Sequence, residues 1–196
     1  ADTPTRVRWE KLLYEDVKGL IRETTDELAK NPNNPIALRM RSRGYYRNNE
    51  QEKGKADAIA ALALLKSPVS AEEFEAKCYA GRRAEKFDEA LFDCTKGIEL
   101  DPKYAWAYYN RGNAKEGKKW PEEAIADYTK AIALDPSFED AYSRRGFVYG
   151  GKKEYDKALT DYTKVIALNP TRGSGFGSRG FIYLQKKEYE LAIADL

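Results

Sequence analysis

Histidine is absent from this chain of 196 residues, and cysteine and methionine are scarce, with two Cys and one Met. Without histidine the chain has no His-based triad, no imidazole general base and no imidazole metal ligand. The longest apolar run, residues 58–65, is far shorter than the roughly 20 residues of a membrane-spanning helix. The sequence therefore predicts a protein that is not an enzyme, holds no metal or cofactor and does not insert into a membrane.

A strong excess of one charge is also lacking. The chain has 34 basic and 32 acidic residues, for a net charge of +2. This balance gives no long-range attraction toward nucleic acid or an acidic membrane, so neither is an expected partner. The first residue is Ala1 rather than Met. Such a start fits either a processed or an engineered end, and it leaves both a cytoplasmic and an exported location open.

A period of 34 residues organises most of the chain. Residues 105–138 and 139–172 follow one plan, and prolines carry the same period upstream. The corresponding positions are Gly112 and Gly146, Ala124 and Ala158, Tyr128 and Tyr162, and the series Pro68, Pro102, Pro136 and Pro170. A fixed period of this length is typical of a repeat array, in which stacked helix pairs bury apolar faces that one pair cannot bury alone.

The order of these columns, an aromatic, a small residue, Ala, an aromatic and a closing Pro, resembles the tetratricopeptide repeat. The resemblance implies an all-α fold, a right-handed α-solenoid of helix-turn-helix repeats. It also implies a non-catalytic scaffold that binds a peptide or protein segment in a concave groove. The expected divisions are an N-terminal capping helix and linker at 1–35, a divergent repeat at 36–70, repeats at 71–104, 105–138 and 139–172, and a truncated repeat at 173–196.

The two ends of the chain depart from the repeat plan. Apolar residues from Trp9 to Leu28 follow helical spacing, which predicts one amphipathic helix to about Lys30, with a break near Gly19. We expect this helix to cap the first repeat; the alternative is a dimerisation helix. At the other end, Leu191, Ile193 and Leu196 form a stripe that a following helix would cover. The sequence therefore indicates that further repeats or a cap have been removed, or that the chain self-associates through this end.

Paired charges recur within the repeats. A basic residue precedes the small residue at Arg43, Lys77, Arg111, Arg145 and Arg179, and an acid follows 16 positions later at Asp93, Asp127, Asp161 and Asp195. The divergent repeat has Ile59 where its acid should be. We predict a salt bridge between the paired helices of each of the other repeats.

Both cysteines occupy columns that face the interior of a helix pair. Cys78 stands in the small-residue column and Cys94 in the aromatic column. Free buried thiols are the expected state. A disulfide between the paired helices is the alternative if the protein is exported.

The resemblance also implies which residues would line the groove. The predicted partner-binding set is Tyr79, Trp106, Tyr109, Asn110, Asn113, Arg144, Phe147 and Phe181. We expect the aromatic rings to be partly exposed and the amides and Arg144 to hydrogen-bond to a bound segment. The structural alternative for the aromatic column is packing between adjacent first helices.

A special form of groove binding is excluded by charge. Some family members hold a terminal carboxylate with a clamp of Lys, Asn and Arg side chains. The corresponding positions here are Glu75, Tyr79, Asn110, Asp140 and Arg144, and only Asn110 and Arg144 have suitable groups. The sequence therefore argues against carboxylate binding of this type.

Two other functions stay open at this point. The chain can be an accessory module of a larger enzyme whose catalytic part lies elsewhere, or an RNA-binding array. Arg39, Arg41, Arg43 and Arg47 crowd one helix, but the equivalent helices carry acids, whereas helical RNA binders repeat their basic charge. We therefore expect a local solvated face here, or a contact for an acidic segment.

Overall fold

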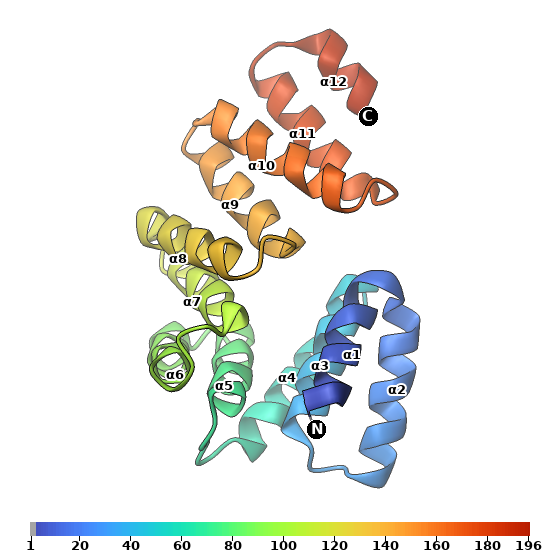
Figure 1. Cartoon of the computed structure of the whole chain (residues 1–196), viewed down its shortest axis with the longest axis vertical. Coiled ribbons are helices and arrows are strands. Elements are labelled where there is room, and N and C mark those ends of the chain that lie inside the picture. Colours follow the sequence, from blue (N-terminus) through green and yellow to red (C-terminus); the bar gives the residue numbers. More distant parts are fainter. Residues whose placement is uncertain (1–2) are drawn as a thin grey trace. The chain divides into compact units, whose positions relative to one another are not determined.

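The computed structural model describes residues 3–196, and within them the chain forms 12 α-helices and no strand (Figure 1). The helices belong to two compact units, residues 1–102 and residues 103–196. Each unit is an array of antiparallel helix pairs, so the all-α prediction is confirmed. Among the described helices, none is long and apolar enough to cross a membrane.

Each helix pair consists of a first helix, here called A, and a second helix, B. Unit 1 contains α1 (Thr3–Glu15), α2 (Val17–Lys30), α3 (Pro35–Arg47), α4 (Gln51–Leu64), α5 (Ala71–Arg83) and α6 (Phe87–Leu100). Unit 2 contains α7 (Ala105–Gly117), α8 (Pro121–Leu134), α9 (Glu139–Gly151), α10 (Tyr155–Leu168), α11 (Gly173–Gln185) and α12 (Tyr189–Asp195).

The same tight turn joins A to B in the five pairs from α3 to α12. One residue of each turn has a positive φ of 59–63°, and these residues are Asn49, Glu85, Lys119, Lys153 and Lys187. None of them is glycine, although this left-handed conformation is costly for residues with a Cβ. The helices on both sides must therefore hold the turn in place, which indicates that pairing of A with B determines its geometry.

The N-terminal segment is two helices, with a break close to the predicted position near Gly19. The break falls at Asp16, three residues before Gly19, and the Asp16 side chain caps α2 by accepting a hydrogen bond of 2.8 Å from the Gly19 amide. α2 begins 34 residues before α4 (51 − 17 = 34) and packs on α3. Thr25 of α2 accepts a hydrogen bond from Arg41, as Thr129 of α8 does from Arg145. In position and contacts, α2 is thus a B helix.

The first well-formed pair is offset by two residues from the predicted alignment. α3 begins 36 residues before α5 (71 − 35 = 36), whereas α5 begins 34 before α7 (105 − 71 = 34), because six residues join α4 to α5 and four join α6 to α7. Gly44 therefore does not face α4: a Cβ on it would meet Ile21 of α2. Ser42 takes the small-residue position and donates a hydrogen bond of 2.6 Å to the Gly54 carbonyl. Pro68 keeps the 34-residue period of the prolines although it lies in the longer loop, so the prolines do not reveal the two-residue offset.

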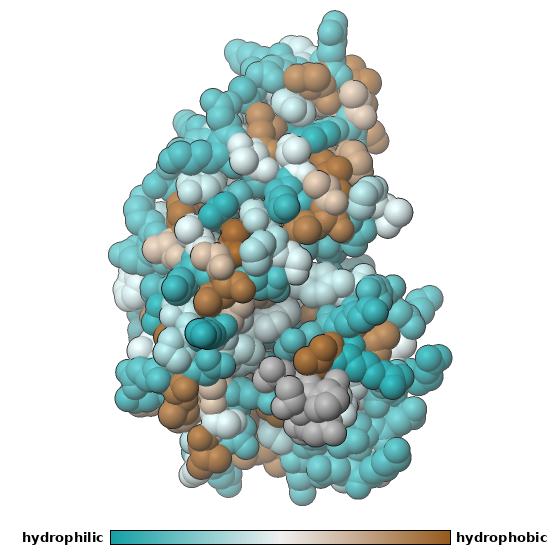
Figure 2. All heavy atoms as spheres, viewed as in Figure 1, coloured by the Kyte–Doolittle hydropathy of each residue, from teal (hydrophilic) through white to brown (hydrophobic). Residues whose placement is uncertain are grey.

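The core of unit 2 forms where each pair meets the next A helix. Ala124 and Tyr128 of α8 pack against Val148 of α9, and Ala158 and Tyr162 of α10 pack against Ile182 of α11 in the same way. At the end of the unit, α12 leaves Tyr189, Leu191 and Ile193 exposed, and Leu196 directly after it is exposed too. Hydrophobic residues are visible in Figure 2 in the region where Figure 1 labels α12.

Candidate partner-binding site

Salt bridges join A to B in all five pairs from α3 to α12. The predicted pairs Arg111–Asp127 and Arg145–Asp161 are confirmed, each with a shortest N–O distance of 2.7 Å. The full set is Arg41–Asp57, Lys77–Asp93, Arg111–Asp127, Arg145–Asp161 and Arg179–Asp195. The prediction that the divergent repeat lacks its pair was wrong, because the two-residue offset brings Arg41 and Asp57 into the columns assigned to Arg43 and Ile59. These charges are engaged in holding the pairs together.

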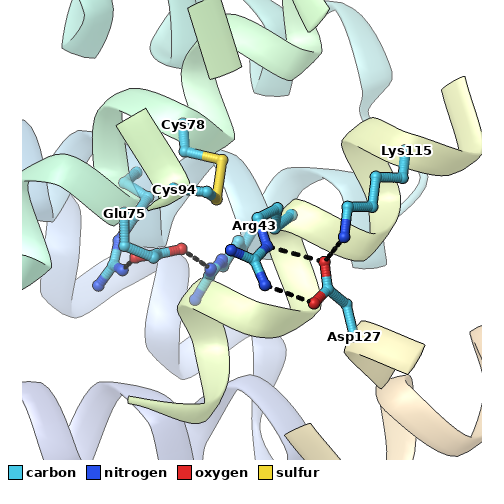
Figure 3. Close-up of a disulfide and its surroundings, with 8 residues drawn as sticks. Arg43, Glu75, Cys78, Cys94, Lys115 and Asp127 are labelled. Carbon is cyan, nitrogen blue, oxygen red and sulfur yellow. Dashed lines mark hydrogen bonds and ion pairs between the residues drawn. A yellow bond between two sulfur atoms is a disulfide. The ribbon is translucent and has the colours of Figure 1, made fainter. Parts of the chain in front are cut away.

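The arginines of α3 do not form a solvated face. Arg39 and Glu75 are both fully buried and form an ion pair, and Arg43 Nη2 donates a hydrogen bond of 2.6 Å to Glu75 Oε1 (Figure 3). Arg47 lies over the Tyr14 ring, with its guanidinium carbon 4.3 Å from the ring centroid. Removal of one partner from a buried ion pair leaves an uncompensated buried charge, which is strongly destabilising. These buried side chains are therefore part of the core of unit 1. The expectation of an exposed acidic-segment contact at these arginines was therefore wrong.

The cysteines form a disulfide between α5 and α6, with an S–S distance of 2.07 Å (Figure 3). The expectation of free thiols was therefore wrong, because the two cysteines are paired. In unit 2 the same two columns contain a glycine and a tyrosine, such as Gly112 and Tyr128, which are in close contact. In α5 and α6 the glycine is replaced by Cys78 and the tyrosine by the smaller Cys94, and the two side chains fill this contact with a covalent bond.

Four of the predicted groove residues lie in the interior, among them Asn113, which is 7% exposed. Tyr79 is 2% exposed, and its hydroxyl lies 3.1 Å from Ser42 Oγ. Trp106 is 8% exposed, and its ring packs on the Phe138 ring with 4.4 Å between the two ring centroids. Asn110 is fully buried. The expectation of partial exposure was wrong for Tyr79 and Trp106, because their neighbours cover both rings.

The remaining residues of the predicted set mostly gather on one face of unit 2. Tyr109, Arg144 and Phe147 line a pocket of about 270 Å³, together with Asp140, Ser143, Tyr162 and Ser178. Phe147 is 60% exposed, and Phe181, 34 residues further on in α11, is 57% exposed. We call the side of α7, α9 and α11 that carries Tyr109, Arg144, Phe147 and Phe181 the pocket face.

A polar network joins Arg144, which lines the pocket, to Glu116, Tyr128 and Asn113. The Tyr128 hydroxyl donates to Glu116 Oε2 at 2.8 Å and lies 3.1 Å from Asn113 Oδ1, and Arg144 Nη1 lies 3.4 Å from Glu116 Oε1. Burial raises the pKa of Tyr128 well above its usual range, helped by the Glu116 carboxylate. Burial lowers the pKa of Arg144, but Tyr109 and Glu116 outweigh it and the net pKa is raised. Tyr128 therefore stays a neutral donor and Arg144 a fixed cation.

Sequence reasoning missed four of the residues that line this pocket. Asp140 was considered only as a wrong-sign clamp residue, and Ser143, Tyr162 and Ser178 were not considered for binding. A helical spacing of i, i+3, i+4 and i+7 places Asp140, Ser143, Arg144 and Phe147 on one side of α9, and this pattern could have indicated the serine. Tyr162 and Ser178 come from neighbouring helices, so only the packing of α9, α10 and α11 reveals them.

No residue of the described chain forms a metal centre: residues 3–196 contain no group of three His, Cys, Asp or Glu side chains arranged to hold an ion. The residues lining the pocket offer hydrogen bonds, charge and aromatic surface. Those properties suit recognition of another molecule by non-covalent contacts.

The repeated helix pairs define this chain as an α-helical repeat protein of the solenoid class. Residues 139–172 and 94–126 match models of the tetratricopeptide repeat, and residues 122–153 match a model of the TPR repeat. The chain therefore contains tetratricopeptide repeats, as its sequence columns predict. Such repeats are in general non-catalytic protein-binding modules, which places the chain among protein-interaction scaffolds.

Solved structures agree with this assignment. The first TPR of Spaghetti (RPAP3), bound to an HSP90 peptide, is 29% identical with a TM-score of 0.58, over 60% of this chain and 94% of that chain. The first TPR domain of human RPAP3 is also 29% identical, with a TM-score of 0.58, over 63% and 98% of the two chains. A thermophilic TPR protein of Thermus thermophilus has the same fold at 18% identity, with a TM-score of 0.64 over 83% and 88%. Comparison with curated protein sequences gives no match.

Proposed function

We propose that this protein binds an extended or helical segment of a partner protein across the pocket face of unit 2. The observation that carries the proposal is the pair of exposed rings, Phe147 and Phe181, at equivalent positions of successive repeats; Phe147 also lines the pocket. Exposed aromatic side chains that cluster beside a concavity mark interaction sites, because they bury a large apolar area at low entropic cost.

The repeat geometry explains why a chain segment suits this face. Equivalent positions on α9 and α11 recur one repeat apart, so contacts to a bound segment can recur at a regular step. Arg144 and Tyr109 add polar groups to the pocket that Phe147 lines. Their hydrogen bonds would fix the orientation of the segment, while the rings supply most of the affinity. The solved RPAP3 complex with an HSP90 peptide supports peptide binding as a mode open to this fold.

The test is selection from a phage-displayed library of random peptides against the whole chain, followed by titration of the selected peptides. If Phe147 or Phe181 is a hot spot, changing it to Ala costs about 2 kcal/mol, or roughly thirtyfold in affinity. Phe92→Ala is the matched control, because Phe92 of α6 is equally exposed, at 61%, but belongs to unit 1. Its affinity should match that of the wild type.

Two results would contradict the proposal. The first is that the selected peptides bind Phe147→Ala and Phe181→Ala as tightly as the wild type. The second is tight, salt-dependent binding of single-stranded poly(U) RNA that the same variants weaken, which would assign the face to nucleic acid. We expect no such RNA binding, because the charged groups lining the pocket include an acid and the chain has little net charge.

A further inference from the structure

The outer side of α4 differs in composition from that of the following B helices. Two and three residues after the acid that pairs with the A helix, α6, α8 and α10 carry a threonine and a lysine: Thr95 and Lys96, Thr129 and Lys130, Thr163 and Lys164. At the same two positions α4 carries Ile59 and Ala60, and Ile59 is 50% exposed. This helix therefore presents apolar side chains to solvent where its counterparts present polar ones.

The exposed apolar residues of α4 share one side of the helix. Ala56, Ile59, Ala60 and Ala63 follow the helical spacing i, i+3, i+4 and i+7, and Leu64 extends the same side. All five residues are exposed, Leu64 to 40%. We call these five residues the α4 face. Contiguous exposed apolar residues of this kind mark a site of association with another molecule.

We propose that the α4 face binds the α4 face of a second copy of this chain, with the two helices antiparallel. Glu52 and Lys66 are both exposed and stand at equal separations from Ile59 (59 − 52 = 7; 66 − 59 = 7). Seven residues are about two helical turns, so Glu52 lies on the same side of α4 as Ile59. An antiparallel pair centred on Ile59 therefore brings Glu52 of one copy opposite Lys66 of the other.

Charge also excludes the opposite orientation. A parallel pair would bring Glu52 opposite Glu52 and Lys66 opposite Lys66, and like charges that face each other oppose association. The helix dipoles favour the antiparallel pair as well. In the part of the chain that the structure describes, neither Glu52 nor Lys66 takes part in an ion pair, whereas their neighbour Lys53 is paired with Glu50. Both charges are thus available for the contact between copies.

The size of the α4 face determines how strong the association should be. The alanines leave room for a second helix to approach closely, and Ile59 and Leu64 supply the larger apolar side chains. A contact between two single helices is smaller than the roughly 1,200 Å² of a standard interface. We therefore expect a weak dimer that forms at high protein concentration. This dimer does not depend on the proposed function, because the pocket face belongs to unit 2 and α4 to unit 1.

Sedimentation equilibrium over a range of concentrations tests the proposal. The full chain carries Ile193→Glu throughout, so that the exposed residues of α12 do not contribute to self-association. We expect a monomer–dimer equilibrium, and Ile59→Glu should raise the dimer Kd by about a hundredfold, because two carboxylates would face each other. Ala126→Glu is the matched control: Ala126 is exposed on α8 at the position equivalent to Ala56, and this change should leave the Kd unaltered.

Charge reversal tests the antiparallel orientation. Glu52→Lys and Lys66→Glu should each raise the Kd by about fivefold, because each replaces an attraction between copies by a repulsion. The double variant should restore the Kd of the parent chain, since the two charges are then exchanged. Ile59→Cys should also form a disulfide between copies on mild oxidation, because Ile59 lies near the symmetry axis, whereas Ala126→Cys should not. The two native cysteines are already paired with each other and do not interfere.

Four results would overturn the inference. The first is a chain that stays monomeric at every concentration, and the second is a dimer whose Kd is unchanged by Ile59→Glu in a variant that circular dichroism shows to be folded. The third is failure of the double charge reversal to restore the Kd. The fourth is a monomeric chain that binds library peptides in a manner dependent on Ile59, which would assign the α4 face to a different protein.

Discussion

Replacing glycine by alanine at two helix positions should change stability in opposite directions. Gly112 lies in the middle of α7, and a Cβ there would stand 2.7 and 2.9 Å from two carbons of the Tyr128 ring. Gly177 lies inside α11, and a Cβ there would meet nothing within 4 Å. Both substitutions add the same methyl group to the interior of an A helix, so their difference isolates the overlap at Gly112.

The magnitudes follow from two opposing effects. Alanine is favoured over glycine in a helix interior by about 1 kcal/mol, and this gain applies at both positions. Overpacking a well-filled core costs typically about 1–3 kcal/mol, and this applies only at Gly112. The Tyr128 ring cannot easily yield, because it is fully buried and its hydroxyl is hydrogen-bonded to Glu116. Gly177→Ala should therefore stabilise by about 1 kcal/mol, and Gly112→Ala should destabilise by up to about 2 kcal/mol.

Thermal unfolding followed by circular dichroism measures both effects. For a chain of this size, Gly177→Ala should raise Tm by about 2–4 °C and Gly112→Ala should lower it. Gly146→Ala should fall between them, because its Cβ would lie 3.2 Å from the nearest atoms of Asp161 and Tyr162. The reasoning would be refuted if Gly112→Ala raised Tm as much as Gly177→Ala does.

Four further predictions concern the rest of the fold. Reducing the Cys78–Cys94 disulfide, which spans 16 residues, should cost about 3 kcal/mol and lower Tm, with no effect of reductant on a double Ser variant. Lys77→Arg should raise Tm slightly by adding a second hydrogen bond to Asp93, as arginine does in the other pairs; an unchanged or lower Tm would count against this. Burial raises the pKa of Asp93 in the folded chain above its pKa in the unfolded chain, so the ionised carboxylate lowers stability at high pH. The stability of the wild type relative to Asp93→Asn should therefore increase as pH falls from the folded-state pKa of Asp93 to its unfolded-state pKa. A slope of opposite sign in urea titrations would contradict that assignment. The exposed stripe of α12 should promote self-association that Ile193→Glu abolishes, which sedimentation at several concentrations would detect.

Much of the fold follows directly from the sequence. The 34-residue period predicts the helix pairs of unit 2, because small residues such as Gly112 are needed wherever A and B approach closely. The same period predicts the Arg111–Asp127 and Arg145–Asp161 salt bridges, since a spacing of 16 places the two charges opposite each other across one turn. These features depend only on the spacing of residues within one repeat, which can be read directly from the sequence.

The candidate site was only partly predictable. Tyr109, Arg144 and Phe147 were identified from their columns, and they do line one pocket. Trp106 and Asn110 belong to the same face in a helical projection, yet both are buried. Trp106 packs on Phe138, which directly precedes α9. The residue pattern of α7 cannot predict a contact with a residue outside that helix.

Tertiary structure alone decided the remaining features. The longer loop before α5 shifts Arg41 into the column assigned to Arg43, and the position of Pro68 conceals this shift. The pairing of Cys78 with Cys94 depends on how closely α5 approaches α6. The sequence determined the period and type of the elements because hydrophobic and small residues recur at fixed local spacings. Loop length, thiol pairing and the exposure of each aromatic ring were left to packing between elements, since these depend on distances between residues far apart in the chain.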